Sequence, residues 1–172
     1  IYTRRDAILQ PRDTMRVALP LTDDRVTATP SGRTLFEIRV SPSAGSKFVP
    51  AAFDVLGPNG LPIAVRVKRR GTDLVCLAHL ENDNYSVKVV GKGNSRGSFL
   101  VRAHLAGDVN GDRAVDGADV RAFRARTGRR DVNLDGSIDP NDVRLTQINR
   151  AAVVTTVPIN VTNNTGLTGQ QG

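Results

Sequence analysis

Apolar and polar residues alternate through most of the first hundred residues of the chain. In "RTLFEIRV" (33–40), "DLVCLAHL" (73–80) and "NYSVKVVG" (84–91), apolar residues recur at every second position. This period of two predicts β-strands with one buried face. Similar segments are 14–19, 51–57, 62–68 and 97–105. Turn signals rich in Gly, Pro and Asn separate them, so the pattern predicts an antiparallel β-sandwich for residues 1–106.

The pattern changes over residues 107–150, which we name the loop–helix part. Two short stretches with helical spacing, 118–127 and 141–149, each follow an Asp-rich segment. The remaining residues, 151–172, carry no charged side chain. In this tail we expect a strand within 153–161 and a linker over 163–172.

The second Asp-rich segment, "DVNLDGSIDPND" (131–142), has oxygen-bearing side chains at its first, third, fifth, ninth and twelfth positions. Calcium is held by twelve-residue loops with this spacing, in which a glycine at the sixth position makes a sharp turn. Zinc prefers His or Cys, and magnesium keeps most of its water. An Asx-rich turn that caps a helix is the alternative. The expected ligands are Asp131, Asn133, Asp135, Asp139, Asp142 and the backbone carbonyl of Ser137.

The first Asp-rich segment, "DVNGDRAVDGAD" (108–119), repeats this spacing 23 residues earlier. Its expected ligands are Asp108, Asn110, Asp112, Asp116, Asp119 and the backbone carbonyl of Ala114. We therefore predict two Ca²⁺ sites, and we call these segments the first and second loops. At the eighth position, Val115 and Ile138 are expected to point into the core. Arg113 replaces the sixth-position glycine, at a backbone strain of about 1 kcal/mol that predicts weaker calcium binding.

The approach to the first loop, "SFLVRAHLAG", alternates like a strand, whereas a standard EF-hand has a helix there. "GDVNGDRAVDGADVRAFRARTG" and "DVNLDGSIDPNDVRLTQINR" resemble a type I dockerin over about a quarter of the chain. The resemblance implies a small calcium-folded module that docks onto a cohesin domain. Cohesin-binding dockerins commonly carry a Ser-Thr-like pair at the tenth and eleventh loop positions. Here these positions hold Gly117-Ala118 and Pro140-Asn141, which puts the identity of the partner in doubt.

The β-rich part carries a second resemblance. "FDVLGPNGLPIAV" and "NYSVKVVGKGNSRGSFLVRAHL" resemble the end of a bacterial pre-peptidase C-terminal domain, a jelly-roll-like sandwich. In that family a Tyr-x-Val-x-Val strand leads into a Gly-rich hairpin and a last strand, matched here by 85–89 and 97–101. The resemblance implies an accessory domain of secreted proteins without catalysis.

Charge and composition narrow the functional classes. The formal net charge is +7, yet residues 108–150 hold eight Asp and eight Arg, so the whole excess lies in 1–107. The basic run "KRR" (68–70) is interpreted as a solvated edge that discourages strand addition. Nucleic-acid binding is the alternative, but the chain has no Trp and only two Tyr to stack on bases. No run of 18 apolar residues exists that would predict a membrane span.

Catalytic motifs are not found. The sequence has no nucleophile elbow, phosphate loop or paired catalytic carboxylates, and the clustered aspartates are assigned to calcium. His79 and His104 are expected to be solvent-facing or hydrogen-bonded strand residues. Cys76 is expected to be a small buried residue. The sequence therefore favours a protein that is not an enzyme.

These patterns together predict a secreted or cell-surface interaction module. In the leading hypothesis, the exposed helix faces bind a cohesin-like partner through Arg121, Arg124 and Gln147. In the alternative, calcium rigidifies the C-terminal segment of a large surface protein, and the loop–helix part packs on its own sandwich. A third hypothesis is an accessory region of a secreted carbohydrate-active or proteolytic enzyme. The first two differ in the exposure of the apolar helix residues Val120, Phe123, Val143, Leu145 and Ile148.

Overall fold

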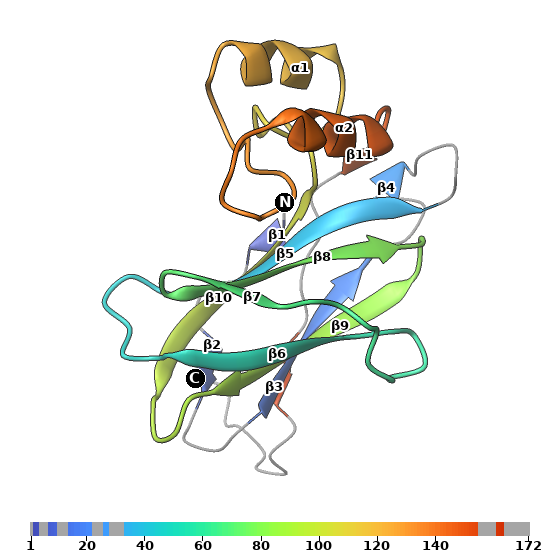
Figure 1. Cartoon of the computed structure of the whole chain (residues 1–172). Coiled ribbons are helices and arrows are strands. Elements are labelled where there is room, and N and C mark those ends of the chain that lie inside the picture. The colour runs from blue at the N-terminus through green and yellow to red at the C-terminus, as the bar shows by residue number, and fades with distance from the viewer. Residues whose placement is uncertain are drawn as a thin grey trace.

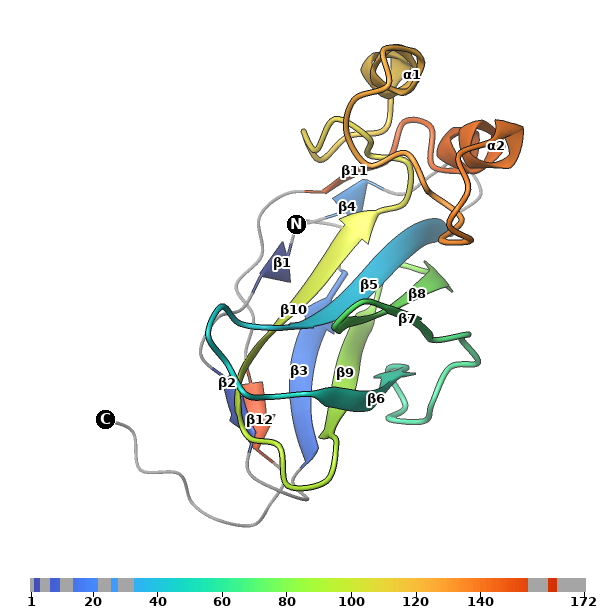
Figure 2. The same cartoon turned by 60° about the vertical axis from the view of Figure 1, so that its left-hand side comes forward.

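Two antiparallel β-sheets lie face to face in the computed structural model, which describes residues 2–3, 7–9, 14–21, 26–27, 33–154 and 161–163 (Figures 1 and 2). The first sheet has the order β1-β10-β5-β8-β7, with β2 also paired to β10. The second sheet has the order β12-β3-β9-β6. The strands are β1 (Tyr2–Thr3), β2 (Ala7–Leu9), β3 (Thr14–Pro20), β4 (Val26–Thr27), β5 (Thr34–Pro42), β6 (Pro50–Leu56), β7 (Lys68–Arg70), β8 (Asp73–Leu80), β9 (Asn84–Gly91), β10 (Gly97–Leu105), β11 (Val153–Val154) and β12 (Val161–Asn163).

Alternation along the strands builds the core between the sheets. Phe36, Ile38 and Val40 of β5 are buried in one cluster with Val87 and Val89 of β9, which belongs to the opposite sheet. Successive side chains of a strand point to opposite faces, so the residues between them on β5 lie on the outer face of the first sheet. The mainly antiparallel β architecture predicted from the sequence is therefore confirmed.

The strand predicted over 62–68 is wrong. Ile63, Val65 and Val67 are half-buried against the core, so the alternation of apolar residues does mark an inward face. However, this segment pairs only through a bridge between Leu56 and Pro62, and strand structure resumes at Lys68. Alternation reports which side chains are buried, and it does not require a hydrogen-bonded neighbour.

In the described residues, two helices follow the sandwich, α1 (Gly117–Arg124) and α2 (Pro140–Ile148). α1 is shorter than the predicted stretch 118–127, and α2 is displaced by one residue from the predicted stretch 141–149. Each begins at a capping aspartate, Asp116 or Asp139, whose side chain accepts a hydrogen bond from the second following backbone N–H. These caps satisfy donors that the first helical turn leaves unpaired. No helix in the described part of the chain is long and apolar enough to cross a membrane.

The loop–helix part packs on the outer face of the first sheet, at one end of β5 and β10 (Figure 2). A small apolar cluster joins the two, with sandwich residues Leu35, Leu77 and Ala106 and loop–helix residues Val109, Ala122, Phe123, Val132 and Leu145. The Asn149 side chain accepts a hydrogen bond from the Leu35 backbone N–H and donates to the backbone carbonyls of Leu35 and Ala106. Asn149 is fully buried, and its side chain continues the backbone hydrogen bonding at the ends of β5 and β10 to the residue that follows α2.

The tail returns to the rest of the molecule. β11 pairs with β4, and β12 pairs with β3. At the described ends of the strand predicted within 153–161, Val153–Val154 and Val161 are in strands, and 155–160 lie outside the described residues. The predicted linker also lies outside them, apart from residue 163 in β12. Before β11, the backbone of Val115 in the first loop exchanges hydrogen bonds with Ala151 and Ala152.

Candidate metal-binding loops

The twelfth-position carboxylate organises the first loop. Asp119 is fully buried, and its Oδ1 accepts hydrogen bonds from the backbone N–H of Val109 (2.8 Å) and Asn110 (3.2 Å). Its Oδ2 accepts a hydrogen bond from the N–H of Asp116 at 2.8 Å. One side chain thus ties the start of the loop to the start of α1.

The second loop repeats this arrangement. Asp142 is fully buried, and its Oδ1 accepts hydrogen bonds from the N–H of Val132 (2.8 Å) and Asn133 (3.0 Å). Its Oδ2 accepts a hydrogen bond from the N–H of Asp139 at 2.9 Å. The repeated spacing in the sequence therefore corresponds to repeated local structure.

The first, third and fifth positions also behave alike in both loops. Each of these side chains accepts a hydrogen bond from a backbone N–H two to five residues further along the loop. The pairs are Arg113 N to Asp108 Oδ2 (3.1 Å), Asp112 N to Asn110 Oδ1 (2.9 Å), Ala114 N to Asp112 Oδ1 (3.0 Å), Gly136 N to Asp131 Oδ2 (3.1 Å), Asp135 N to Asn133 Oδ1 (2.8 Å) and Ser137 N to Asp135 Oδ1 (2.7 Å).

The sixth and eighth positions distinguish the loops. Arg113 has the left-handed φ of 77° expected for the turn, and Gly136 has a φ of 97°. Val115 is buried as predicted, but Ile138 is 49% exposed, so the prediction that Ile138 points into the core is wrong. The tail covers Val115 through its backbone pairing, whereas Ile138 lines an open groove on the helix surface.

The donor set fits a hard cation, because every expected side-chain ligand is a carboxylate or amide oxygen. In the described residues, no three His, Cys, Asp or Glu side chains gather around one point as they do at a bound metal. In both loops the carboxylate oxygens instead accept backbone N–H groups, and the Asn110 and Asn133 amides donate to Asp112 and Asp135.

Among the described residues, two carboxyl groups have shifted pKa values. Burial raises the pKa of Asp108, the first residue of the first loop, although hydrogen bonds from the backbone N–H of Arg113 and Gly111 act in the opposite direction. Hydrogen bonds from the Ser137 N–H and the Asn133 side chain lower the pKa of the exposed Asp135. A cation near Asp108 would offset the cost of burying its negative charge.

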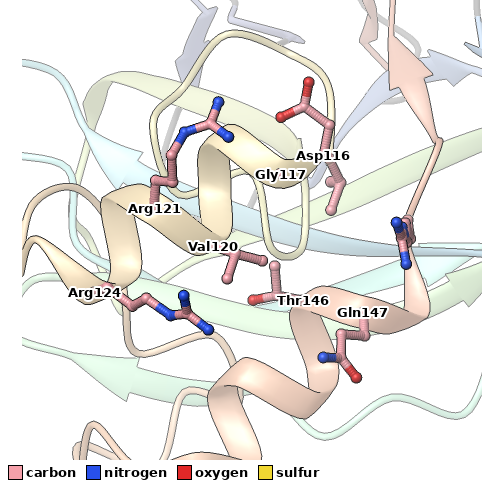
Figure 3. Close-up of a pocket in the computed structure, with 9 residues that line it drawn as sticks. Asp116, Gly117, Val120, Arg121, Arg124, Thr146 and Gln147 are labelled. Carbon is pink, nitrogen blue, oxygen red and sulfur yellow. The ribbon is translucent and has the colours of Figure 1, made fainter.

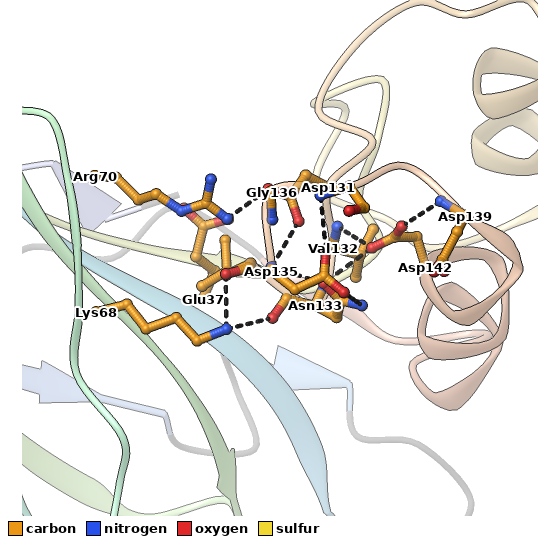
Figure 4. Close-up of polar contacts among 12 residues, drawn as sticks. Glu37, Lys68, Arg70, Asp131, Val132, Asn133, Asp135, Gly136, Asp139 and Asp142 are labelled. Carbon is orange, nitrogen blue, oxygen red and sulfur yellow. Dashed lines mark hydrogen bonds and ion pairs between the residues drawn. The ribbon is translucent and has the colours of Figure 1, made fainter.

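The sandwich reaches the second loop through β7 (Figure 4). Arg70 Nη2 lies 2.6 Å from Asp131 Oδ2, and Lys68 Nζ donates to the backbone carbonyls of Leu134 (2.7 Å) and Asn133 (3.4 Å). β7 is an edge strand, as the interpretation of "KRR" required, but its side chains are not simply solvated. The signal that sequence reasoning missed is that Lys68 and Arg70, two residues apart on a strand, share one face.

The three residues predicted to bind a partner lie around one groove. Arg121, Arg124 and Gln147 are exposed and line a groove of about 310 Å³ between α1 and α2 (Figure 3). A second groove of about 480 Å³, which also includes Gln147, is lined by Ile138 and Val143 among others.

The apolar residues of the helices divide between the interior and these grooves. Phe123 and Leu145 pack into the cluster against the sandwich. Val120 and Val143 are half-buried and line the grooves, and Ile148 is 41% exposed. Intramolecular packing therefore occupies only part of the helix surface.

The two histidines differ, and the cysteine is buried. His79 is exposed, as predicted. His104 is buried and its Nδ1 has no hydrogen-bond partner among the described residues, contrary to the expectation of a solvated or bonded group. Burial, assisted by the nearby Arg129 and Arg102, lowers the pKa of His104 to about 3. Cys76 is buried as predicted, and burial raises its pKa to about 12.

Comparison of the chain with protein-family models, with curated proteins and with solved structures finds no match in any of the three.

Proposed function

We propose that this chain is a non-catalytic calcium-binding module of a secreted or cell-surface protein, whose loop–helix part docks onto a protein partner. The observation that carries the proposal is the repetition of the loops. Equivalent side chains, 23 residues apart, accept equivalent backbone hydrogen bonds in both copies. A polar turn that only caps a helix needs one aspartate and gives no reason to repeat five oxygen-bearing positions.

The residues that would hold calcium are those at the five loop positions and the seventh-position carbonyls. They are Asp108, Asn110, Asp112, Ala114, Asp116 and Asp119 in the first loop, and Asp131, Asn133, Asp135, Ser137, Asp139 and Asp142 in the second. Each loop contains four carboxylates, whose mutual repulsion a divalent cation offsets. We infer that calcium stabilises the loops and with them the helices that they precede.

The partner-binding surface in this proposal is the groove between α1 and α2. Arg121, Arg124 and Gln147 surround it, and α1 and α2 leave their outward faces uncovered by the sandwich. The resemblance of the loop–helix part to a type I dockerin suggests a cohesin-like partner, and the jelly-roll-like resemblance of the sandwich suggests an accessory role beside it.

A structural role is the second candidate, and the interface with the sandwich favours it. The buried Asn149, the apolar cluster around Leu35 and the contacts of Lys68 and Arg70 all attach the loop–helix part to its own sandwich. In this role calcium rigidifies one end of a larger surface protein, and no partner is needed.

Capture experiments with the full chain distinguish the two candidates. The wild type and an Arg121→Ala/Arg124→Ala/Gln147→Ala variant are used to capture partners from the secreted fraction, with calcium or with a chelator. Docking predicts a partner that is captured with calcium and lost in the variant, whereas Arg96→Ala, an exposed arginine of the sandwich, retains it. If calcium raises the melting temperature but neither protein captures a partner, the structural role is favoured. If calcium does not bind, both candidates fail.

A further inference from the structure

Basic residues of the sandwich contact the second loop, and only some of the residues of β7 take part. Lys68 and Arg70 lie on the face of the strand that meets the loop. Arg69, between them, donates instead to the backbone carbonyl of Pro50 at 2.7 Å. The basic run is thus divided between two faces, and only one of them contacts the calcium loop.

Arg70 contacts the second loop at its first-position carboxylate. Its guanidinium lies 2.6 Å from Asp131 Oδ2, the oxygen that also accepts the Gly136 N–H. Asp131 Oδ1 accepts the N–H of Asp135. The Arg70 and Asp131 side chains are 32% and 25% exposed, so the pair is partly shielded from water. Its field acts on the loop more strongly than that of a fully solvated pair.

Lys68 contacts the same loop from its backbone side. Its ammonium group donates to the carbonyls of Leu134 and Asn133, at the third and fourth loop positions. Figure 4 shows both basic side chains extending from the sandwich toward this one loop. Two positive charges therefore lie against a loop that carries four carboxylates.

The first loop has different neighbours. Its first-position carboxylate, Asp108, is buried and forms no ion pair with a described residue. The guanidinium of Arg129 donates to the backbone carbonyl of Asp108 at 3.3 Å, and Arg129 belongs to the loop–helix part itself. Contacts from β7 to a metal loop are therefore a property of the second copy.

We propose that Lys68 and Arg70 are positioning residues that hold the second loop on the sandwich and lower its affinity for calcium. This inference rests on the proposed calcium binding. Two effects act in the same direction. The two cations oppose the approach of a divalent ion, and the contacts stabilise the metal-free loop, which reduces the free energy gained on binding. The sandwich thus sets the calcium concentration at which the second loop fills.

Calcium titration of the full chain tests the inference, with amide resonances of Gly111 and Gly136 reporting the first and second loops separately. The probe is CaCl₂. A Lys68→Gln/Arg70→Gln variant is expected to bind calcium at the second loop about tenfold more tightly, with the first loop unchanged. Arg69→Gln is the control for each single substitution, because it removes one positive charge from the same strand at a residue that does not contact the loop. It is expected to leave both dissociation constants unchanged.

The inference is overturned if the Gly136 dissociation constant in the double variant is unchanged or larger, or if Arg69→Gln lowers it equally. If the double variant does not fold, the single variants Lys68→Gln and Arg70→Gln test the inference in its place. Each is expected to lower the Gly136 dissociation constant for calcium about threefold. If both glycines of the wild type respond to calcium but the variants bind it with unchanged affinity, this inference fails and the proposed calcium binding stands. If neither glycine of the wild type responds to calcium, the proposed function fails as well.

Discussion

Single residues explain why the two loops are not equivalent. The sixth position needs a left-handed backbone, which glycine adopts freely and a residue with a Cβ adopts at a cost. Gly136 provides this in the second loop, and Arg113 is forced into it in the first, at φ 77°. The fourth position is reversed, with Gly111 at φ 81° in the first loop and Leu134 at φ 58° in the second, so each loop bears this strain at a different position.

Arg113→Gly is expected to stabilise the loop–helix part by about 1 kcal/mol and to tighten calcium binding at the first loop only. Thermal unfolding and a calcium titration measure the two effects. Gly136→Ala is the reciprocal change and is expected to destabilise the second loop by a similar amount. Its Cβ would lie 3.6 Å from Arg70 Nη1, an ordinary contact, so backbone strain alone accounts for the loss. A neutral result for both substitutions would contradict the strain argument.

His104 is expected to make stability dependent on pH. Burial lowers the pKa of His104 from 6.5 to about 3. Between these two pH values the imidazole is protonated in the unfolded chain and neutral in the folded protein. The contribution of the neutral His104 imidazole to the free energy of unfolding is complete above pH 6.5. It is lost as the pH falls toward 3, by at most about 1.4 kcal/mol per pH unit.

Urea unfolding between pH 7.5 and 5 measures the effect of His104. The stability of the wild type is expected to fall relative to His104→Leu as the solution becomes more acidic. His79→Leu, which replaces the exposed histidine of β8, is expected to follow the wild type. Parallel curves for the wild type and His104→Leu would show that this imidazole does not contribute.

At the scale of elements, the side chain of Asn149, the residue that follows α2, hydrogen-bonds this end of the helix to the sheet, beside the apolar contact made by Leu145. Asn149→Ala removes hydrogen bonds of 2.7, 2.5 and 2.7 Å and leaves the N–H and carbonyl of Leu35 and the carbonyl of Ala106 buried without this partner. The expected loss of unfolding free energy is about 3 kcal/mol. Chemical denaturation measures it, with the exposed Gln147→Ala as a control expected to change stability by less than about 0.5 kcal/mol. Equal losses for the two variants would refute the role of Asn149.

The strands and loops differ in how well their sequences predict them. The strands at 73–80 and 84–91 follow from alternation, and the capping aspartates mark where both helices begin. Alternation also produced the wrong strand over 62–68, because burial of side chains and pairing of the backbone are separate conditions. The hydrogen bonds of Asn149 to Leu35 and Ala106, 114 and 43 positions earlier, leave no local signal, since asparagine is also a common helix-ending residue.

The contacts between the sandwich and the loop–helix part could not be predicted from the sequence either. Nothing in "KRR" indicates which arginine faces a loop more than 60 residues away, because strand order decides which elements meet. The difference between Val115 and Ile138 also depends on distant neighbours. The tail pairs with the first loop at Val115, which is buried, whereas the equivalent Ile138 of the second loop is exposed. The spacing of oxygen-bearing residues that predicts the two loops is local in the sequence, whereas the neighbours of each loop depend on the whole fold.

At the scale of the whole molecule, the loop–helix part lies on the outer face of a sandwich that has its own core. A segment of about 43 residues buries too little apolar surface to fold readily unaided. Calcium at 100 times its dissociation constant contributes about 2.7 kcal/mol per site, or about 5 kcal/mol for two sites. That is comparable with the whole stability of a small domain, about 5 to 15 kcal/mol. We therefore expect calcium to be a condition for the folding of residues 108–150.

Amide hydrogen exchange of the full chain, with calcium and after chelation, tests this claim most directly. Chelation is expected to remove the protection of residues 108–150, including α1 and α2. The central strands β5, β8 and β9 are expected to exchange as slowly as before, because most of the core between the two sheets comes from strand residues, with Val115 as the contribution of the first loop. If residues 108–150 are equally protected in both conditions, the loops do not depend on calcium and the account is wrong.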